Sequence, residues 1–258
     1  MTMRLQNKVI IVTGATAGIG AAIVESSLRE GAKVLVHGLN EAEGKALVAR
    51  LGNSAQLCIA DLSDASAPQQ IVQAALSAFG RIDGLVNNAA NLERSNLAHL
   101  TPEKFEAVLQ VNVKAPLFLI QSAMPELKKS QGAVLNIGSI NAYAGESSLL
   151  AYSISKGALQ TMTRNLANAH GVDRVRFNQI NPGWVLTERE DRDQVARGLP
   201  AGWHQNLDRS QIPFGAMTTS ADMGEAAIFW LSDESRTFTG TILELEQFSI
   251  IGRNPEKL

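Results

Sequence analysis

The sequence predicts a doubly wound α/β fold, in which a mostly parallel, seven-stranded sheet carries helices on both faces. Three observations support this fold class. Short apolar runs rich in β-branched residues alternate with segments of helical periodicity along the chain. A glycine-rich turn follows the first of these runs directly. Hydrophobic residues make up 45% of the 258 residues and no composition break divides the chain, so a single domain is expected.

Seven short runs are predicted as strands, and the first, a β-branched run, has the composition of a strand that is buried on both faces of a parallel sheet. In chain order they are residues 8–13, 32–37, 56–60, 81–86, 133–138, 175–180 and 241–245. The segments between them place apolar residues at helical spacing. Because right-handed crossovers put such helices on both faces, the alternation predicts a doubly wound sheet.

The first run is followed by Gly14-Ala15-Thr16-Ala17-Gly18-Ile19-Gly20, where a helical period begins. The three glycines permit a tight turn and a close approach of the backbone to a ligand. The free N–H groups and the dipole at a helix start favour an anion. Glycines can also serve turn geometry alone, but the strand before and the helix after favour a site for the pyrophosphate of a dinucleotide.

The end of the second run bears on which dinucleotide is preferred. An acidic side chain there binds the ribose hydroxyls of NAD, whereas an arginine accepts the 2′-phosphate of NADP. This chain has Gly38-Leu39-Asn40 and therefore neither group. No carboxylate repels the phosphate and His37 is near enough in sequence to reach it, so NADP is favoured over NAD. Asn40 is expected to cap the next helix.

Polar residues also follow the third and fourth runs. Asp61-Leu62 closes the third run, where the aspartate would either meet the adenine amino group or cap the next helix. Asn87-Asn88-Ala89-Ala90 follows the fourth run. Because the carboxyl ends of parallel strands form one edge of the sheet, these residues are expected to line the ligand crevice.

A long helix is predicted to begin at Thr101-Pro102, a capping hydroxyl followed by a proline. Pro116 lies inside this helix and has no N–H, so the carbonyl of Asn112, four residues earlier, loses its intrahelical partner. The freed carbonyl would hold a water molecule at the resulting kink. Alternatively, the kink only fits the helix to its neighbours.

Residues 139–156 carry the main indication of catalysis. Ser139 follows the fifth run, so its hydroxyl is expected at the end of a strand. Tyr152 and Lys156 stand four residues apart and share one face if the segment is helical. The ammonium is expected to lower the pKa of the phenol from about 10 toward 7, which corresponds to about 4 kcal/mol. Such pairs are also common on solvated helix surfaces, so the spacing alone leaves both interpretations open.

Residues 184–217 show no clear secondary-structure pattern and are expected to form a substrate-binding lid, a usual role for such a segment in a compact domain. The charge run 188–193 within it is interpreted as a solvated helix face. The candidate substrate residues are Asn141, Glu146, Trp184 and His204, with Asn91 and Glu93 as further polar candidates. This polar set with an indole suits a sugar or polyol better than a long acyl chain.

Composition argues against several other classes of protein. Lys+Arg is 23 against Asp+Glu 25, a net charge of −2, so no basic surface is expected to attract nucleic acid or an anionic membrane. The single cysteine, Cys58, cannot form an internal disulfide and indicates a reducing compartment. The four histidines are scattered, so no metal site is predicted. Residues 1–8 do not resemble a signal peptide and the longest apolar run, residues 115–120, is too short to span a membrane, so a cytoplasmic protein is expected.

Six motifs occur in the order and spacing of the short-chain dehydrogenase/reductases, and the resemblance covers nearly the whole chain. They are Thr13-Gly14-x3-Gly18-x-Gly20, Asn87-Asn88-Ala89, Asn112, Ser139, Tyr152-x3-Lys156 and Asn181-Pro182-Gly183. The resemblance implies a Rossmann-like fold, with residues 1–258 as a single dinucleotide-binding catalytic domain. It also implies an NAD(P)(H)-dependent oxidoreductase that interconverts a secondary alcohol and a ketone, and that forms a homotetramer or homodimer.

By similarity to that family, the catalytic residues are Asn112, Ser139, Tyr152 and Lys156. Tyr152 would exchange the proton, Lys156 would lower the pKa of that phenol and hold the nicotinamide ribose, and Ser139 would bind the reacting oxygen. Asn112 would anchor a water that leads to the lysine. The family's cofactor-binding positions correspond here to Gly14, Thr16, Ala17, Gly18, Ile19, Gly20, Gly38, Leu39, Asp61, Leu62, Asn88, Ala89, Tyr152, Lys156, Pro182, Gly183, Val185 and Thr187.

The chain departs from the family pattern at three places. Ala90 and Ile154 are mild changes. At the C-terminal end Glu246-Gln247-Phe248 replaces the usual Asp-Gly-Gly turn, which bears on the expected tetramer contact and on one wall of the substrate pocket. Two alternatives remain. One is a non-catalytic NAD(P)-binding regulatory or scaffold protein, and the other is an enzyme for 3-oxoacyl-type or apolar ketones.

Overall fold

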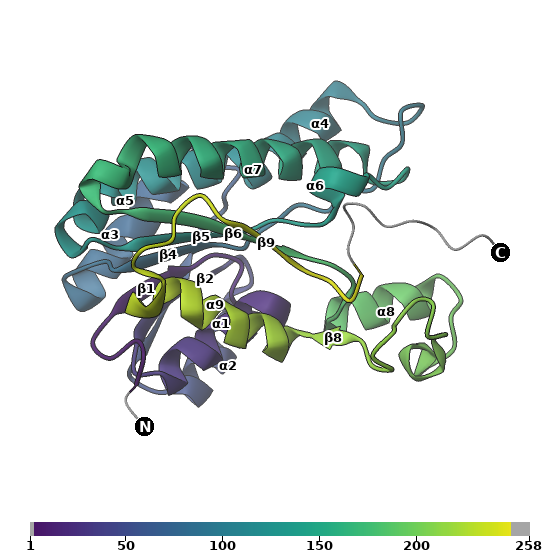
Figure 1. The fold of residues 1–258 in the computed structure, drawn as a ribbon, viewed down its shortest axis with the longest axis horizontal. Helices are drawn as coiled ribbons and strands as arrows, with labels where there is room; N and C mark the ends of the chain where they lie inside the picture. Colours follow the sequence, from purple (N-terminus) through teal and green to yellow (C-terminus); the bar gives the residue numbers. More distant parts are fainter. Residues whose placement is uncertain (1–2, 249–258) are drawn as a thin grey trace.

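A computed structural model describes residues 3–248, and it confirms the doubly wound α/β fold (Figure 1). The central sheet has seven strands in the order β3-β2-β1-β4-β5-β6-β9. Every neighbouring pair in it is parallel. The strands are β1 (Val9–Val12), β2 (Lys33–Gly38), β3 (Ala55–Ile59), β4 (Gly84–Asn87), β5 (Ala133–Ile137), β6 (Arg176–Pro182) and β9 (Ile242–Leu245). All seven predicted strands are therefore present.

Helices cover both faces of the sheet, and alternate strand residues point to opposite faces. Ile10 and Val12 of β1 pack in one cluster with residues of α1 and α9, whereas Ile11 packs with residues of α3 and α5 on the other side. Figure 1 shows the same two layers. The helices are α1 (Gly18–Arg29), α2 (Glu41–Leu51), α3 (Ala67–Phe79), α4 (Pro102–Leu109), α5 (Ala115–Ser130), α6 (Asn141–Ala144), α7 (Leu150–His170), α8 (Glu188–Ala196) and α9 (Ser220–Leu231).

The sixth strand is longer than its apolar run indicated. The sequence has Asn181-Pro182-Gly183 directly after the predicted run 175–180, but β6 continues through Pro182, which pairs with Leu245. A proline has no N–H to give to a ladder, yet its carbonyl still accepts, here from the backbone N–H of Ile140 at 3.1 Å. This places Pro182 at the very end of a strand, where the missing donor does little harm.

The predicted kink near Pro116 is a π-helical turn, η1 (Gln110–Lys114), between α4 and α5. The N–H of Ala115 bonds the carbonyl of Gln110, five residues earlier, at the point where Pro116 cannot continue the i→i+4 pattern. The extra residue turns the side chain of Asn112 into the interior, where it is 1% exposed. As predicted, Thr101 caps the start of α4, accepting from the N–H of Lys104 at 3.3 Å.

The continuous helical run Pro102–Ser130 is long and apolar enough to cross a membrane by length and composition alone. It is longer than residues 115–120, the apolar run that was predicted to be too short to span a membrane. In this fold it packs against α3 and α7 and buries Val108, Leu119 and Leu127, as the core helix of an α/β protein does.

The segment that follows β6 has secondary structure of its own. It contains β7 (Val185–Leu186), α8 and the 3₁₀ turn η3 (Trp203–Asn206), and β7 pairs with β8 (Thr218–Thr219) just beyond it. Trp203, Ile212 and Met217 form a separate small hydrophobic cluster. In Figure 1 this segment projects from one end of the sheet. The name "lid" refers below to residues 184–217.

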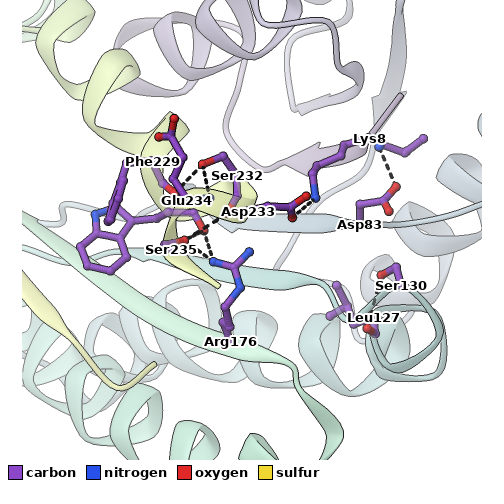
Figure 2. A network of polar contacts seen from close by, with 12 residues as sticks. Lys8, Asp83, Leu127, Ser130, Arg176, Phe229, Ser232, Asp233, Glu234 and Ser235 are labelled. Atoms are coloured by element: carbon purple, nitrogen blue, oxygen red, sulfur yellow. Dashed lines mark hydrogen bonds and ion pairs between the residues drawn. The ribbon is translucent and has the colours of Figure 1, made fainter. Parts of the chain in front are cut away.

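A polar network closes the opposite, amino-terminal edge of the sheet (Figure 2). The guanidinium of Arg176, at the start of β6, binds the carbonyl of Trp230 at 2.8 Å and the hydroxyl of Ser235. The 3₁₀ turns η2 (Gly171–Asp173) and η4 (Asp233–Ser235) lie near this edge. Lys8 binds Asp233 at 2.7 Å. These contacts attach α9 to the sheet and leave the carboxyl-terminal edge to the functional residues.

Candidate active site

The turn after β1 is built around two glycines in the left-handed region, Gly14 with φ 59° and Gly18 with φ 56°. A Cβ added to Gly14 would lie 2.8 Å from the Cα of Ala89, so a side chain does not fit there. At Gly20 an added Cβ would lie 2.6 Å from Nδ2 of Asn88. The turn and the segment after β4 are therefore packed backbone to backbone.

Helix α1 begins at Gly18 without a side-chain cap, because Ala17 occupies the capping position. Its first turn also carries no acidic residue, in contrast to α2 and α8. The first N–H groups of α1 thus have no side chain of their own to satisfy them and are free to bind an anion. This observation fits the pyrophosphate of a dinucleotide.

Asn88 holds the glycine turn in place. Its side-chain amide donates to the carbonyls of Thr13 and Gly14, each at 2.9 Å, and its backbone N–H donates to Oγ1 of Thr13 at 3.0 Å. Asp61 lines the cavity, as its predicted role at the adenine requires, and accepts from the N–H of Ser63 at 2.8 Å. The alternative that it caps the next helix is wrong, because α3 begins at Ala67 and Ser66 occupies its capping position.

The expectation that His37 could reach a 2′-phosphate is wrong. Its ring is 1% exposed, and Nδ1 accepts from the N–H of Gly14 at 3.2 Å. Nε2 lies 2.9 Å from the carbonyl of Ala60 and must therefore be the protonated nitrogen. Burial lowers the pKa of His37, which favours this neutral form. The histidine supports the glycine turn from inside the sheet.

Asn40 caps α2 as predicted, accepting from two backbone N–H groups.

Ser139, Tyr152 and Lys156 meet in the wall of one cavity, at the carboxyl ends of β5 and β6. Ser139 follows β5, and its backbone N–H donates to Oδ1 of Asn181 at 3.1 Å. The side chain of Ser139 acts on the phenol of Tyr152 and favours a lower pKa for it. Lys156 donates from Nζ to the carbonyl of Ile137 at 2.7 Å. The pair Tyr152 and Lys156 is therefore buried in a cleft and is not a solvated surface pair.

The direction predicted for the pKa of Tyr152 is wrong for the protein in this structure. Burial raises the pKa of Tyr152 to about 12, and the hydrogen bond from Ser139 acts only partly against it. Burial also lowers the pKa of Lys156 to about 8, because an ammonium is poorly solvated there. The ammonium lies beside the phenol, with Nζ 5.4 Å from the ring centroid. Its attraction does not outweigh the burial of the hydroxyl.

Asn112 is not part of the cavity wall. Its side chain accepts from the backbone N–H of Asn91 at 2.7 Å and donates to the carbonyl of Asn91 and to Oγ of Ser155, both at 3.0 Å. It thus connects η1 to α7, three residues beyond Tyr152. The water that its carbonyl would hold stays a prediction.

The cavity has a volume of about 690 Å³. All predicted cofactor residues except Gly20 line it, from the glycine turn through Gly38 and Leu39 to Pro182, Gly183, Val185 and Thr187. Thr187 also faces Gly18 directly, since a Cβ on that glycine would lie 3.7 Å from Cγ2 of the threonine. Among the described residues, the predicted positions that do not line the cavity are Gly20, Asn91, Glu93, Asn112, Asn141, Glu146 and His204.

The substrate residues were predicted less well. Trp184 lines the cavity, and its indole N–H donates to Glu190 at 2.8 Å. Glu146 instead accepts from Arg94 and from Ser148, each at 2.7 Å, outside the cavity wall. His204 packs edge-on against Trp203, with 5.8 Å between the ring centroids.

Several lining residues carry no signal in the sequence. The charge run 188–193 was predicted to be a solvated helix face. Its residues in α8 do keep contact with solvent, but several of them also line the mouth of the cavity. A run of alternating charges does not reveal which face a neighbouring element will cover. The lining residues that sequence reasoning missed include Glu43, Leu92, Arg94, Val111, Glu188, Arg189, Glu190, Arg192, Asp193 and Arg197. Within residues 3–248 no group of three or more His, Cys, Asp or Glu side chains is placed to hold a metal ion.

Comparisons with known proteins agree with this geometry. A family model described as enoyl-(acyl carrier protein) reductase matches residues 14–246. The short-chain dehydrogenase/reductase FrzI of Cladobotryum sp is 36% identical over 246 residues, which cover 93% of this chain and 94% of the relative. The L-fucose dehydrogenase of Mus musculus is 34% identical over 238 residues, which cover 92% of this chain and 86% of the relative.

Two solved structures are similar over almost the whole chain. The 3-oxoacyl (acyl-carrier-protein) reductase from Agrobacterium tumefaciens C58 with NADP bound has a TM-score of 0.84 and 32% identity, covering 95% of each chain. The 3-ketoacyl-(acyl-carrier-protein) reductase from Brucella melitensis complexed with NADH has a TM-score of 0.83 and 28% identity, covering 93% of this chain and 97% of that one. The chain therefore belongs to the short-chain dehydrogenase/reductase family and is an NAD(P)-dependent oxidoreductase.

Proposed function

We propose that the protein interconverts a secondary alcohol and a ketone, with Tyr152 as the proton donor and acceptor. The observation that carries this proposal is that Ser139, Tyr152 and Lys156 line the same cavity, with Nζ of Lys156 5.4 Å from the ring centroid of Tyr152. A substrate oxygen placed between the two hydroxyls receives a proton from Tyr152 or returns one to it, while Ser139 orients it. The bound nicotinamide dinucleotide supplies or accepts the hydride.

The cofactor would lie along the cavity, with its pyrophosphate at the start of α1 and its nicotinamide end beside Gly183 and Thr187. The end of β2 offers no carboxylate, which supports NADP over NAD. Glu43, in the first turn of α2, also lines the cavity and opposes a 2′-phosphate. The two solved relatives hold NADP and NADH respectively, so both cofactors are included in the test.

A sugar or polyol is the proposed substrate. The ring of Trp184 in the cavity wall provides an apolar surface for the C–H face of a sugar, next to the charged side chains of α8. The similarity to an L-fucose dehydrogenase supports this class. The similarity to 3-oxoacyl reductases supports the alternative, a 3-oxoacyl-type ketone. A screen of sugars, polyols, 3-oxoacyl esters and apolar ketones with each cofactor decides between them, and turnover of apolar ketones alone rules out the sugar.

The role of Tyr152 is tested with Tyr152→Phe. Removing one hydroxyl from a general acid is expected to lower kcat on the order of 10² to 10⁴-fold while nicotinamide fluorescence reports unchanged cofactor affinity. Tyr143→Phe is the matched control, because this exposed tyrosine does not line the cavity. Full activity in Tyr152→Phe would contradict the proposal.

A cytoplasmic location stays a prediction.

A further inference from the structure

The two residues that follow β9 bind the lid near both of its ends, in addition to the pairing of β7 with β8 and the burial of Val185 in the main core. Trp184, the first residue of the lid, donates its backbone N–H to Oε2 of Glu246 at 3.1 Å. At the other end, the side-chain amide of Gln247 accepts from the N–H of Phe214 at 3.1 Å and donates to the carbonyl of Ala216 at 2.6 Å. Figure 1 shows the end of β9 beside the base of the lid.

The space around Gly183 is shaped to admit the glutamate. The main-chain ladder between β6 and β9 ends where the N–H of Gly183 bonds the carbonyl of Leu245 at 2.9 Å. One residue further the carboxylate of Glu246 replaces a backbone carbonyl as the acceptor, and a side chain on Gly183 would overlap that carboxylate. Gly183 and Trp184 line the cavity, whereas Glu246 lies behind them.

Between its two ends the lid packs largely against itself. Trp203, Ile212 and Met217 form its own cluster, and Trp184 stacks on Trp203 with 5.2 Å between ring centroids and 25° between ring planes. Because the lid holds together as a unit, its position over the cavity depends on how its two ends are attached.

We propose that Glu246 and Gln247 are positioning residues that hold the lid in place over the reacting groups. Both lie where this chain replaces the usual Asp-Gly-Gly turn of the family, a change that bears on the tetramer contact and on one wall of the substrate pocket. In this chain the substituted residues instead connect the sheet to the lid. The consequence for turnover rests on the proposed function, whereas the attachment itself does not.

Amide hydrogen exchange tests the attachment without any substrate. Removing an acceptor from a backbone N–H is expected to raise the exchange rate in residues 184–217 on the order of tenfold in Glu246→Ala and in Gln247→Leu. Glu246→Gln keeps an oxygen acceptor for the N–H of Trp184 and is expected to exchange like the wild type. Glu244→Ala is the matched control, because this β9 residue pairs with Asn181 in the sheet and, within residues 3–248, its carboxylate has no hydrogen bond or ion pair to the lid. Unchanged exchange in both disruptive variants, or fast exchange in Glu246→Gln, would overturn the proposal.

Steady-state kinetics with a substrate found in the screen tests the consequence. Losing a hydrogen bond that only places the lid is expected to raise KM on the order of tenfold in Glu246→Ala, with kcat within about twofold, and Glu246→Gln is expected to restore KM. A large fall in kcat at unchanged KM would overturn the positioning role. If the wild type turns over no substrate, the proposed function fails, and the exchange measurement still decides whether Glu246 and Gln247 hold the lid.

Discussion

Tyr152 and Lys156 lie in the wall of the same cavity, and both side chains are almost fully buried. Burial favours the neutral form of each, so it raises the pKa of the phenol to about 12 and lowers the pKa of the ammonium to about 8. The spacing of the two residues predicted that the ammonium lies beside the phenol. It did not predict the desolvation, which raises the pKa of Tyr152 and so opposes the effect of the ammonium. In the proposed reaction, the charge of an oxidised nicotinamide ring would add to that of Lys156 and favour the phenolate.

Burial of the Lys156 ammonium has a measurable consequence for stability. The pKa of Lys156 is lowered from 10.5 to about 8, so between these values the unfolded chain binds more protons than the folded one. Stability therefore rises with pH across this window. From pH 7 to pH 9.5 the wild type is expected to gain on the order of 2 kcal/mol in its free energy of unfolding relative to Lys156→Met.

Urea denaturation at the two pH values measures this difference. The pH range ends below 10 because of Tyr152. Near pH 10 this phenol loses its proton in the unfolded chain but not in the folded protein, and that difference lowers the free energy of unfolding as the pH rises. Lys114→Met serves as the control, because Lys114 is exposed and outside the cavity wall. An equal gain in wild type and Lys156→Met would show that the ammonium is well solvated in the folded protein.

At the scale of elements, the strands were predicted because short runs such as β1 and β5, which are buried throughout, alternate with segments of helical period, a pattern that needs no knowledge of its neighbours. The internal structure of the lid was not predicted beyond the charged helix face, because its cluster joins Trp203, Ile212 and Met217 across nonperiodic sequence, and α8 has no apolar stripe. The π turn was foreseen only as a kink. Pro116 shows that a hydrogen bond is missing, but not that one extra residue fills the gap.

The turn between β1 and α1 gives a prediction about one glycine. Gly14→Ala places a Cβ at positive φ and 2.8 Å from the backbone of Ala89, so at least 1–2 kcal/mol of stability is expected to be lost and cofactor affinity is expected to fall on the order of tenfold. Gly52→Ala is the matched control, since Gly52 has φ 80° with nothing within 4 Å of an added Cβ.

Thermal unfolding and cofactor titration separate the two effects. Gly52→Ala is expected to lose stability through backbone strain alone and to bind the cofactor like the wild type. Equal cofactor affinity in Gly14→Ala and Gly52→Ala would mean that the turn does not hold the pyrophosphate.

Across the whole molecule, the proposed cofactor residues were easier to predict than the substrate residues for a topological reason. Every strand of the sheet is parallel, so the segments after β1, β2, β3 and β4 must meet at one edge whatever the helices do. Sheet topology does not determine where the substrate candidates Asn141, Glu146 and His204 lie. They lie in a short helix, a loop and a 3₁₀ turn, whose side chains are directed by contacts that sequence does not reveal.

The outer surface bears on the expected homotetramer or homodimer, which stays a prediction. Leu117 and Phe118 of α5 are 39% and 40% exposed, and Ile154 of α7 is 45% exposed. The hydrogen bond between Asn112 and Ser155 links η1, which directly precedes α5, to the first turns of α7, where Ile154 lies. Exposed apolar side chains on both helices favour association with a second copy of the chain.

Sedimentation equilibrium of the wild type is therefore expected to give a dimer or tetramer. Phe118→Glu combined with Ile154→Glu is expected to lower the mass toward the monomer, because two carboxylates would have to be desolvated in the interface. Val172→Glu is the matched control, since Val172 is 90% exposed on the turn after α7, at the other end of that helix. A monomeric wild type at tens of micromolar, or an unchanged mass in the double variant, would contradict association through α5 and α7. Retained far-ultraviolet circular dichroism in the double variant separates loss of association from loss of folding.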